Sequence, residues 1–212
     1  DLPLKEPDDE QFEFLESAYE RTDLTALDFV TIDSAHTEDM DDALYIEKDD
    51  AGYTLYVAIA DPTGYISETS KFNEQAANRA FSIYLPGRDI PMLPRCLSDN
   101  LCSLRPGQIR PALVGIMRCD LNGKLDFSAT NFTLANIISK GKLVYNEVSD
   151  YLEGKENAKI PEDNIACLLK VLVDFTKVRD NYRATHAASF RNHPDYEFIL
   201  NKEGALDHIE VN

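Results

Sequence analysis

The sequence feature that most constrains the fold is an acidic segment enclosed by two short apolar ones. Residues 29–32 (FVTI) and 43–46 (ALYI) are rich in β-branched and aromatic side chains, which predicts two β-strands. Between them, residues 33–42 hold five carboxylates and one possible cation, His36. These residues are therefore expected to form a loop that solvates its charges, raises their pKa values or binds a cation.

The spacing of the carboxylates limits which cation they could bind. An EF-hand calcium loop needs carboxylates at positions 1, 3 and 5, glycine at position 6 and glutamate at position 12. Counted from Asp39, those last three positions are Ala43, Leu44 and Asp50, so the EF-hand is excluded. The spacing D-x5-D-x-D-D suits carboxylates that share one or two Mg²⁺ ions, as in in-line attack on phosphodiesters. On spacing alone, a solvated acidic loop is an equally good interpretation.

Two longer segments resemble a known family. Residues 29–47 (FVTIDSAHTEDMDDALYIE) resemble the active-site signature of the RNB family of exoribonucleases, typified by bacterial ribonuclease II. Residues 79–113 (RAFSIYLPGRDIPMLPRCLSDNLCSLRPGQIRPAL) resemble the family's second signature, including its proline spacing and its LCSL element. Residues 142–145 and 186–198 are also similar to ribonuclease II, so the resemblance covers nearly the whole chain.

The resemblance implies an activity and a metal site. The activity is processive, Mg²⁺-dependent hydrolysis of single-stranded RNA from the 3′ end to 5′-nucleoside monophosphates, with Mn²⁺ as a possible substitute. The catalytic, metal-binding residues would be Asp33, Asp39, Asp41 and Asp42. Of these, Asp33 and Asp42 are expected to be direct ligands, and the resemblance implies that Asp39 and Asp41 complete the site, with a role for one of them in positioning the attacking water.

The resemblance also implies three RNA-contact residues. Tyr84 and Phe190 match aromatic residues that stack on the 3′-terminal bases, and Tyr145 matches a residue near the terminal ribose, where a 2′-hydroxyl distinguishes RNA from DNA. His36 is expected to face solvent, because Mg²⁺ prefers oxygen ligands to imidazole.

The expected architecture is an α+β fold with a mixed or antiparallel sheet and packed helices. Residues 1–212 would form the N-terminal portion of a single RNB catalytic domain. Because the chain starts at Asp1, we expect a longer parent protein. Its further parts would include OB-type RNA-binding domains and a downstream arginine that stabilises the transition state, and residues 1–212 alone are expected to have little nuclease activity. The alternative is a non-catalytic RNA- or cation-binding module that retains the acidic loop.

The distribution of charge agrees with a cation site beside a phosphate track. The net charge is −17, but residues 1–61 hold 19 acidic and 3 basic side chains, whereas residues 62–212 hold 19 and 18. From Arg79 to Arg118 there are six arginines and two acidic residues. Affinity for nucleic acid depends on such basic side chains, so strong RNA binding is expected to need help from outside this chain.

Composition also bears on compartment. No stretch approaches the ~18 apolar residues of a membrane span, and we expect neither a signal peptide nor a membrane partner. The four cysteines lack C-x-x-C or zinc-ligand spacing, which predicts reduced, mostly buried thiols in a cytoplasmic protein.

Local patterns predict the remaining elements. Helices are expected for residues 8–21, 72–82, 142–152 and 161–186, and strands for residues 29–32, 43–48, 53–60, 113–119 and 125–139. Residues 196–200 and 206–211 should form a hairpin, and the proline-rich residues 84–94 an extended, stiff loop. The last helix carries an apolar stripe that should face the core: Ile165, Leu168, Leu169, Leu172, Phe175 and Val178.

Overall fold

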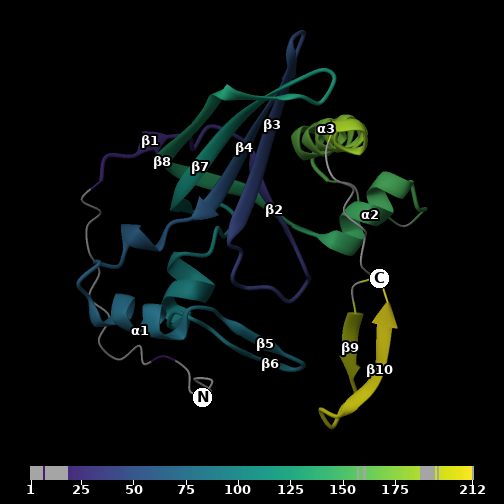
Figure 1. Cartoon of the computed structure of the whole chain (residues 1–212). Helices are drawn as coiled ribbons and strands as arrows, with labels where there is room; N and C mark the ends of the chain where they lie inside the picture. The colour runs from purple at the N-terminus through teal and green to yellow at the C-terminus, as the bar shows by residue number, and fades with distance from the viewer. Residues whose placement is uncertain are drawn as a thin grey trace.

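The computed structural model describes residues 7, 19–156, 158–159, 161–186, 194 and 196–211. The helix expected for residues 8–21 lies outside this part of the chain, except for its last residues. The described residues form an α+β structure (Figure 1), as expected from the sequence.

A six-stranded mixed sheet organises the fold. Its order is β1-β8-β2-β3-β4-β7, and β8 also pairs with β7, so that the strands close into a ring. The parallel pairs are β1–β8 and β2–β8, and the other pairs are antiparallel. The strands are β1 (Thr22–Asp23), β2 (Phe29–Asp33), β3 (Asp42–Asp49), β4 (Gly52–Ala60), β7 (Ile109–Asp120) and β8 (Leu125–Val144).

Alternation along β2 divides the core into two clusters. Phe29 points into the ring, where it packs with Met40, Leu104, Ile137 and other buried residues. Its neighbour Val30 points the other way, since successive side chains of a strand face opposite sides. There it packs under α3 (Asp163–His186), whose residues Ile165, Leu168 and Leu169 are buried. Leu172 and Phe175 pack against the same cluster, which confirms this part of the predicted stripe.

Three smaller units surround the sheet. They are α1 (Lys71–Arg79) with the hairpin β5 (Ile83–Leu85) and β6 (Arg88–Ile90), α2 (Tyr145–Glu153), and the hairpin β9 (Tyr196–Leu200) and β10 (Leu206–Val211). One-turn segments follow β4 (Pro62–Gly64, 3₁₀) and β6 (Leu97–Leu101, π). In Figure 1 the β5–β6 hairpin and the β2–β3 loop project from the same end of the sheet.

Two local predictions were wrong. Residues 84–94 do not form only an extended loop: Ile83 pairs with Ile90 across a tight turn at Gly87, whose φ of +71° suits glycine. The helix expected from residue 142 starts at Tyr145, because Lys142–Val144 pair with the end of β2 and so prolong β8. Other boundaries shift by a few residues; α1, for example, ends at Arg79, because Ala80 adopts a left-handed conformation.

The helices and the cysteines bear on the cellular compartment expected from the sequence. Among the described residues, no helix is both long and apolar enough to cross a membrane. Cys102 and Cys119 are buried, Cys96 is half-buried and Cys167 is exposed, so the expectation of buried thiols holds for two of the four cysteines.

Candidate metal centre and RNA-contact residues

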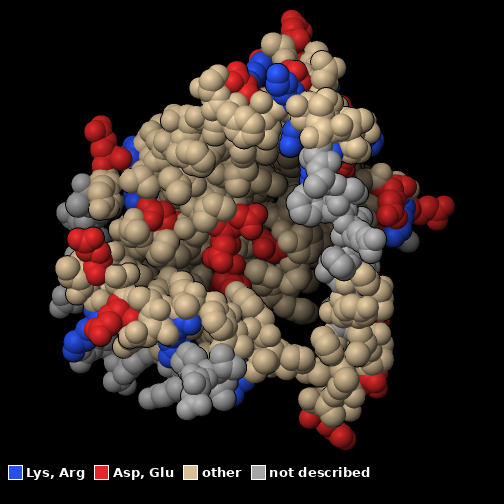
Figure 2. Space-filling view, in the orientation of Figure 1, with Lys and Arg blue, Asp and Glu red and all other residues tan. Residues whose placement is uncertain are grey.

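The ends of two paired strands bring the predicted aspartates together. Asp33 is the last residue of β2 and Asp42 is the first residue of β3, and the β2–β3 loop carries Asp39 and Asp41. The carbonyl of Asp41 accepts a hydrogen bond of 2.8 Å from the amide of Ala60, which ties the loop to β4. Figure 2 shows acidic side chains gathered in a recess over the region where this loop lies in Figure 1.

The carboxyl group of Asp33 is in an unfavourable environment for a charge. Burial is the largest cause that raises its pKa, and the negative charges of Asp42 and Asp39 add to the rise, while the Thr31 hydroxyl and the Lys142 ammonium oppose it. The Thr31 hydroxyl lies near the Asp33 carboxyl group, but the two do not meet the geometric criteria for a hydrogen bond. Among the described residues, the buried oxygens Thr31 Oγ1 and Asp33 Oδ2 have no hydrogen-bond partner.

Asp41 shows the mutual repulsion most clearly. Burial, followed by the charges of Asp39, Asp42 and Asp33, raises the pKa of Asp41 to about 6. The residue as a whole is nevertheless exposed to solvent, which screens part of this repulsion. The structure thus brings all four predicted aspartates within reach of one another's charge.

The four aspartates offer the type of ligand that a hard divalent cation prefers. Such cations take carboxylate oxygens, and a cation would offset both the repulsion and the unpartnered Oδ2 of Asp33. Within the described residues, however, no three His, Cys, Asp or Glu side chains converge closely enough to hold an ion as they stand. Binding would therefore require the carboxylates to draw together.

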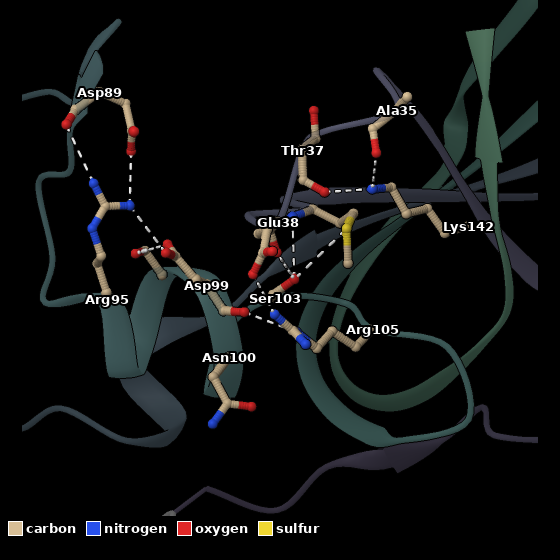
Figure 3. Close-up of polar contacts among 12 residues, drawn as sticks. Ala35, Thr37, Glu38, Asp89, Arg95, Asp99, Asn100, Ser103, Arg105 and Lys142 are labelled. Atoms are coloured by element: carbon tan, nitrogen blue, oxygen red, sulfur yellow. Dashed lines mark hydrogen bonds and ion pairs between the residues drawn. The ribbon is translucent and has the colours of Figure 1, made fainter. Parts of the chain in front are cut away.

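Two side chains that sequence reasoning missed, those of Lys142 and Ser103, hold the acidic loop (Figure 3). On one side, the Lys142 ammonium donates to the carbonyls of Ala35, at 3.1 Å, and of Thr37. On the other side, the Ser103 hydroxyl donates to the Glu38 carbonyl at 2.7 Å. Lys142 is more than 100 residues from the loop in sequence, and Ser103 is more than 60 residues from it. No local sequence pattern therefore indicates either contact.

Tyr84 lies directly at the acidic loop. Its hydroxyl donates to Asp39 Oδ2 at 2.8 Å, and 66% of the residue is exposed. Burial of the hydroxyl and then the hydrogen bond to Asp39 raise the pKa of Tyr84 to about 12. A groove between the loop and the β5–β6 hairpin is lined by Tyr84 and by residues such as Arg88 and Arg95.

The other predicted RNA-contact residues have different outcomes. Tyr145 begins α2 directly after the β8 residue that pairs with Asp33, and it is exposed. Burial, followed by the charges of Asp33 and Asp42, raises the pKa of Tyr145, which places its hydroxyl in the field of the acidic cluster. Phe190 lies outside the described residues. His36 is exposed, as expected.

Comparison with known proteins agrees with this geometry. The profile of the RNB domain matches residues 21–212. The chain belongs to the RNB family. Exoribonuclease 2 of Klebsiella pneumoniae (strain 342) is 49% identical over 206 residues, which cover 97% of this chain and 32% of the relative. The chain therefore spans about a third of the length of such relatives.

Two solved structures of other proteins share the fold. Mycoplasma genitalium RNase R, in complex with ribose-methylated single-stranded RNA, superposes with a TM-score of 0.84 at 32% identity over 91% of this chain and 30% of that one. Yeast Ssd1, described as a pseudonuclease, superposes with a TM-score of 0.63 at 20% identity, over 79% of this chain and 20% of that one. Because a pseudonuclease shares the fold, activity has to be argued from the site residues.

Proposed function

We propose that this chain is the N-terminal part of the catalytic domain of a 3′-to-5′ exoribonuclease that hydrolyses single-stranded RNA processively to 5′-nucleoside monophosphates. The observation that carries the proposal is the placement of four carboxylates close together in one segment: Asp33 ends β2, Asp42 begins β3, and Asp39 and Asp41 lie on the loop between them. The raised pKa values of Asp33 and Asp41 and the unpartnered Oδ2 of Asp33 support it, because a bound cation would offset both. The similarity to Exoribonuclease 2 and to an RNase R that binds single-stranded RNA supports it.

The four aspartates would hold Mg²⁺, for which Mn²⁺ can substitute. When bound, such ions activate a water molecule and stabilise charge on the leaving oxygen. The chain's own contribution is to fix the loop between two paired strands and to keep Oδ2 of Asp33 buried. Lys142 keeps positive charge beside Asp33 and leaves the carboxylate oxygens free, because its ammonium bonds to loop carbonyls.

The two tyrosines would hold the 3′ end of the RNA. The exposed ring of Tyr84 offers a stacking surface next to Asp39, and stacking contributes about 1–3 kcal/mol per base for any sequence. Tyr145 lies near Asp33 and Asp42, where its hydroxyl can reach a ribose. Arg88 and Arg95 also line the groove beside Tyr84, but Arg95 is paired with Asp89 at 3.0 Å and with Asp99 at 3.1 Å. Basic side chains from the rest of the protein would therefore be needed to offset the charge of phosphates.

The proposal concerns the whole protein, because the chain spans about a third of its relatives' length. Further OB-type domains of the same polypeptide would supply the basic surface that a chain of net charge −17 needs for RNA. The site of action would be the cytoplasm.

Incubation of the full-length protein with 5′-labelled single-stranded RNA and Mg²⁺ tests the proposal. We expect a ladder of 3′-shortened products that EDTA abolishes. Asp41→Asn should reduce turnover by orders of magnitude while RNA binding is largely retained, since the change weakens cation binding but also lowers the repulsion of phosphate.

The matched control is Asp50→Asn, in the turn at the opposite end of β3, which should hydrolyse RNA normally. RNA or cation binding without shortening of the RNA would reject the enzyme and favour a non-catalytic binding module.

A further inference from the structure

The buried side chain of Ser103 contacts the acidic loop on both sides of Asp39. Ser103 is fully buried, and its hydroxyl donates to the carbonyl of Glu38 at 2.7 Å. The same hydroxyl accepts a hydrogen bond of 3.2 Å from the amide of Met40. One hydroxyl group thus fixes the residue before Asp39 and the residue after it (Figure 3).

Ser103 is itself held in place by its surroundings. The buried guanidinium of Arg110 donates from Nε to the Ser103 carbonyl at 3.0 Å and from Nη2 to the Asn100 carbonyl at 3.1 Å. The next residue, Leu104, donates from its amide to the Met40 carbonyl at 2.9 Å. The anchor is therefore a rigid part of the core rather than a surface contact.

The only hydrogen bond recorded for the Asp39 carboxylate within the described residues comes from Tyr84, at Oδ2. Its direction is otherwise set by the backbone of residues 38–40, which Ser103 fixes from inside the protein. Only a side chain that both donates and accepts a hydrogen bond can make these two contacts, and alanine can make neither.

We propose that Ser103 is a positioning residue for the metal centre: it aims the Asp39 carboxylate at the cation by holding residues 38 and 40. The inference rests on the proposed function of the aspartates. Because Ser103 is fully buried, it acts through the loop backbone and touches neither cation nor RNA. Removal of a group that orients a metal ligand without touching the metal typically lowers metal affinity or activity by 10–100-fold.

The test compares Ser103→Ala with Ser139→Ala in the full-length protein. Ser139 is equally buried, but its hydroxyl donates to the Gly141 carbonyl at 3.2 Å, within β8 and away from the loop. Three experiments are run on each variant: calorimetry for Mn²⁺ affinity, steady-state kinetics for kcat and KM with RNA, and hydrogen exchange of the Met40 amide without metal.

For Ser103→Ala we expect about a 10–100-fold loss of Mn²⁺ affinity or kcat. KM for RNA should change less than twofold, and the Met40 amide should exchange faster. Ser139→Ala should match the wild type in all three. If Ser103→Ala does not fold, Ser103→Cys, which keeps the volume and a weak donor, should give an intermediate loss.

A Ser103 variant that folds and keeps Mn²⁺ affinity, kcat and Met40 exchange within twofold of the Ser139→Ala values would overturn the inference. Absence of RNA hydrolysis by the wild type would instead reject the proposed function, and the Mn²⁺ and exchange measurements would still decide the role of Ser103.

Discussion

Asp41→Asn should stabilise the metal-free protein while it impairs hydrolysis. Burial and the charges of Asp39, Asp42 and Asp33 raise the pKa of Asp41 from its ordinary value of 3.8 to about 6. The folded state therefore binds the Asp41 proton more tightly than the unfolded state does. The ionised carboxylate therefore lowers the free energy of unfolding. This loss of stability begins as the pH rises above about 4 and reaches its full size above about 6.

The size of the effect follows from this pKa. The difference between 3.8 and about 6 corresponds to about 3 kcal/mol for a fully desolvated group. Because Asp41 is exposed to solvent, which screens the repulsion, we expect about 1 kcal/mol. For a domain of this size, that gain raises the melting temperature by about 2–4 °C. Asparagine carries no charge, so the gain should be largest at pH 7–8 and should vanish near pH 4.

Thermal unfolding in EDTA at pH 7.5 and at pH 4.5 measures the effect. Asp126→Asn is the control with the opposite sign: Asp126 accepts hydrogen bonds from the hydroxyl and the amide of Ser128, which lower its pKa. That variant should be no more stable than the wild type. If Asp41→Asn lowered the melting temperature at pH 7.5, or raised it equally at both pH values, the repulsion argument would be refuted.

Three further predictions concern the stacking ring of Tyr84, a tight turn and a buried ion pair. Tyr84→Ala should lengthen the final products of RNA digestion more than it slows hydrolysis, whereas Tyr84→Phe, which keeps the ring, should preserve product length; gel analysis of end products decides this. Gly123→Ala should lower the free energy of unfolding by several kcal/mol, because the new Cβ would clash with the Val178 carbonyl of α3. Gly107→Ala is the control: its φ is similar but its new Cβ would have no atom within 4 Å, so it should cost only about 1 kcal/mol in urea unfolding. Arg21→Met should cost about 3–5 kcal/mol in urea unfolding, because it leaves the buried Asp61 carboxylate without its cation at 2.5 Å, and Arg21→Met combined with Asp61→Asn should cost less.

The parts of the fold that follow local patterns were predictable from the sequence. Alternating apolar residues and the Asp49–Gly52 turn indicated β3 and β4, and their antiparallel pairing is confirmed. The acidic loop was found in the same way, because its five carboxylates fall within ten residues of the sequence.

Features that depend on distant contacts were not predictable. Lys142–Val144 have a local pattern that suits a helix, but their pairing with β2, more than 100 residues earlier, makes them a strand. The three prolines of residues 84–94 indicated an extended loop and so concealed the β5–β6 hairpin. All three lie outside its strands, which are only three residues each and too short to give a pattern of their own. Ser103 and Lys142 reach the loop only through the closed ring of strands, and a lone serine or lysine gives no such signal in sequence.

The central claim is that Asp33, Asp39, Asp41 and Asp42 form one metal site. Crystals of the full-length protein soaked in Mn²⁺ would test it directly through an anomalous difference map. We predict a peak within about 2.0–2.4 Å of the Asp33 and Asp42 carboxylates, with Asp39 and Asp41 drawn toward it, and loss of that peak in Asp41→Asn or its clear weakening. A protein that hydrolyses RNA with Mn²⁺ while its anomalous peak lies elsewhere, away from these four aspartates, would contradict the account.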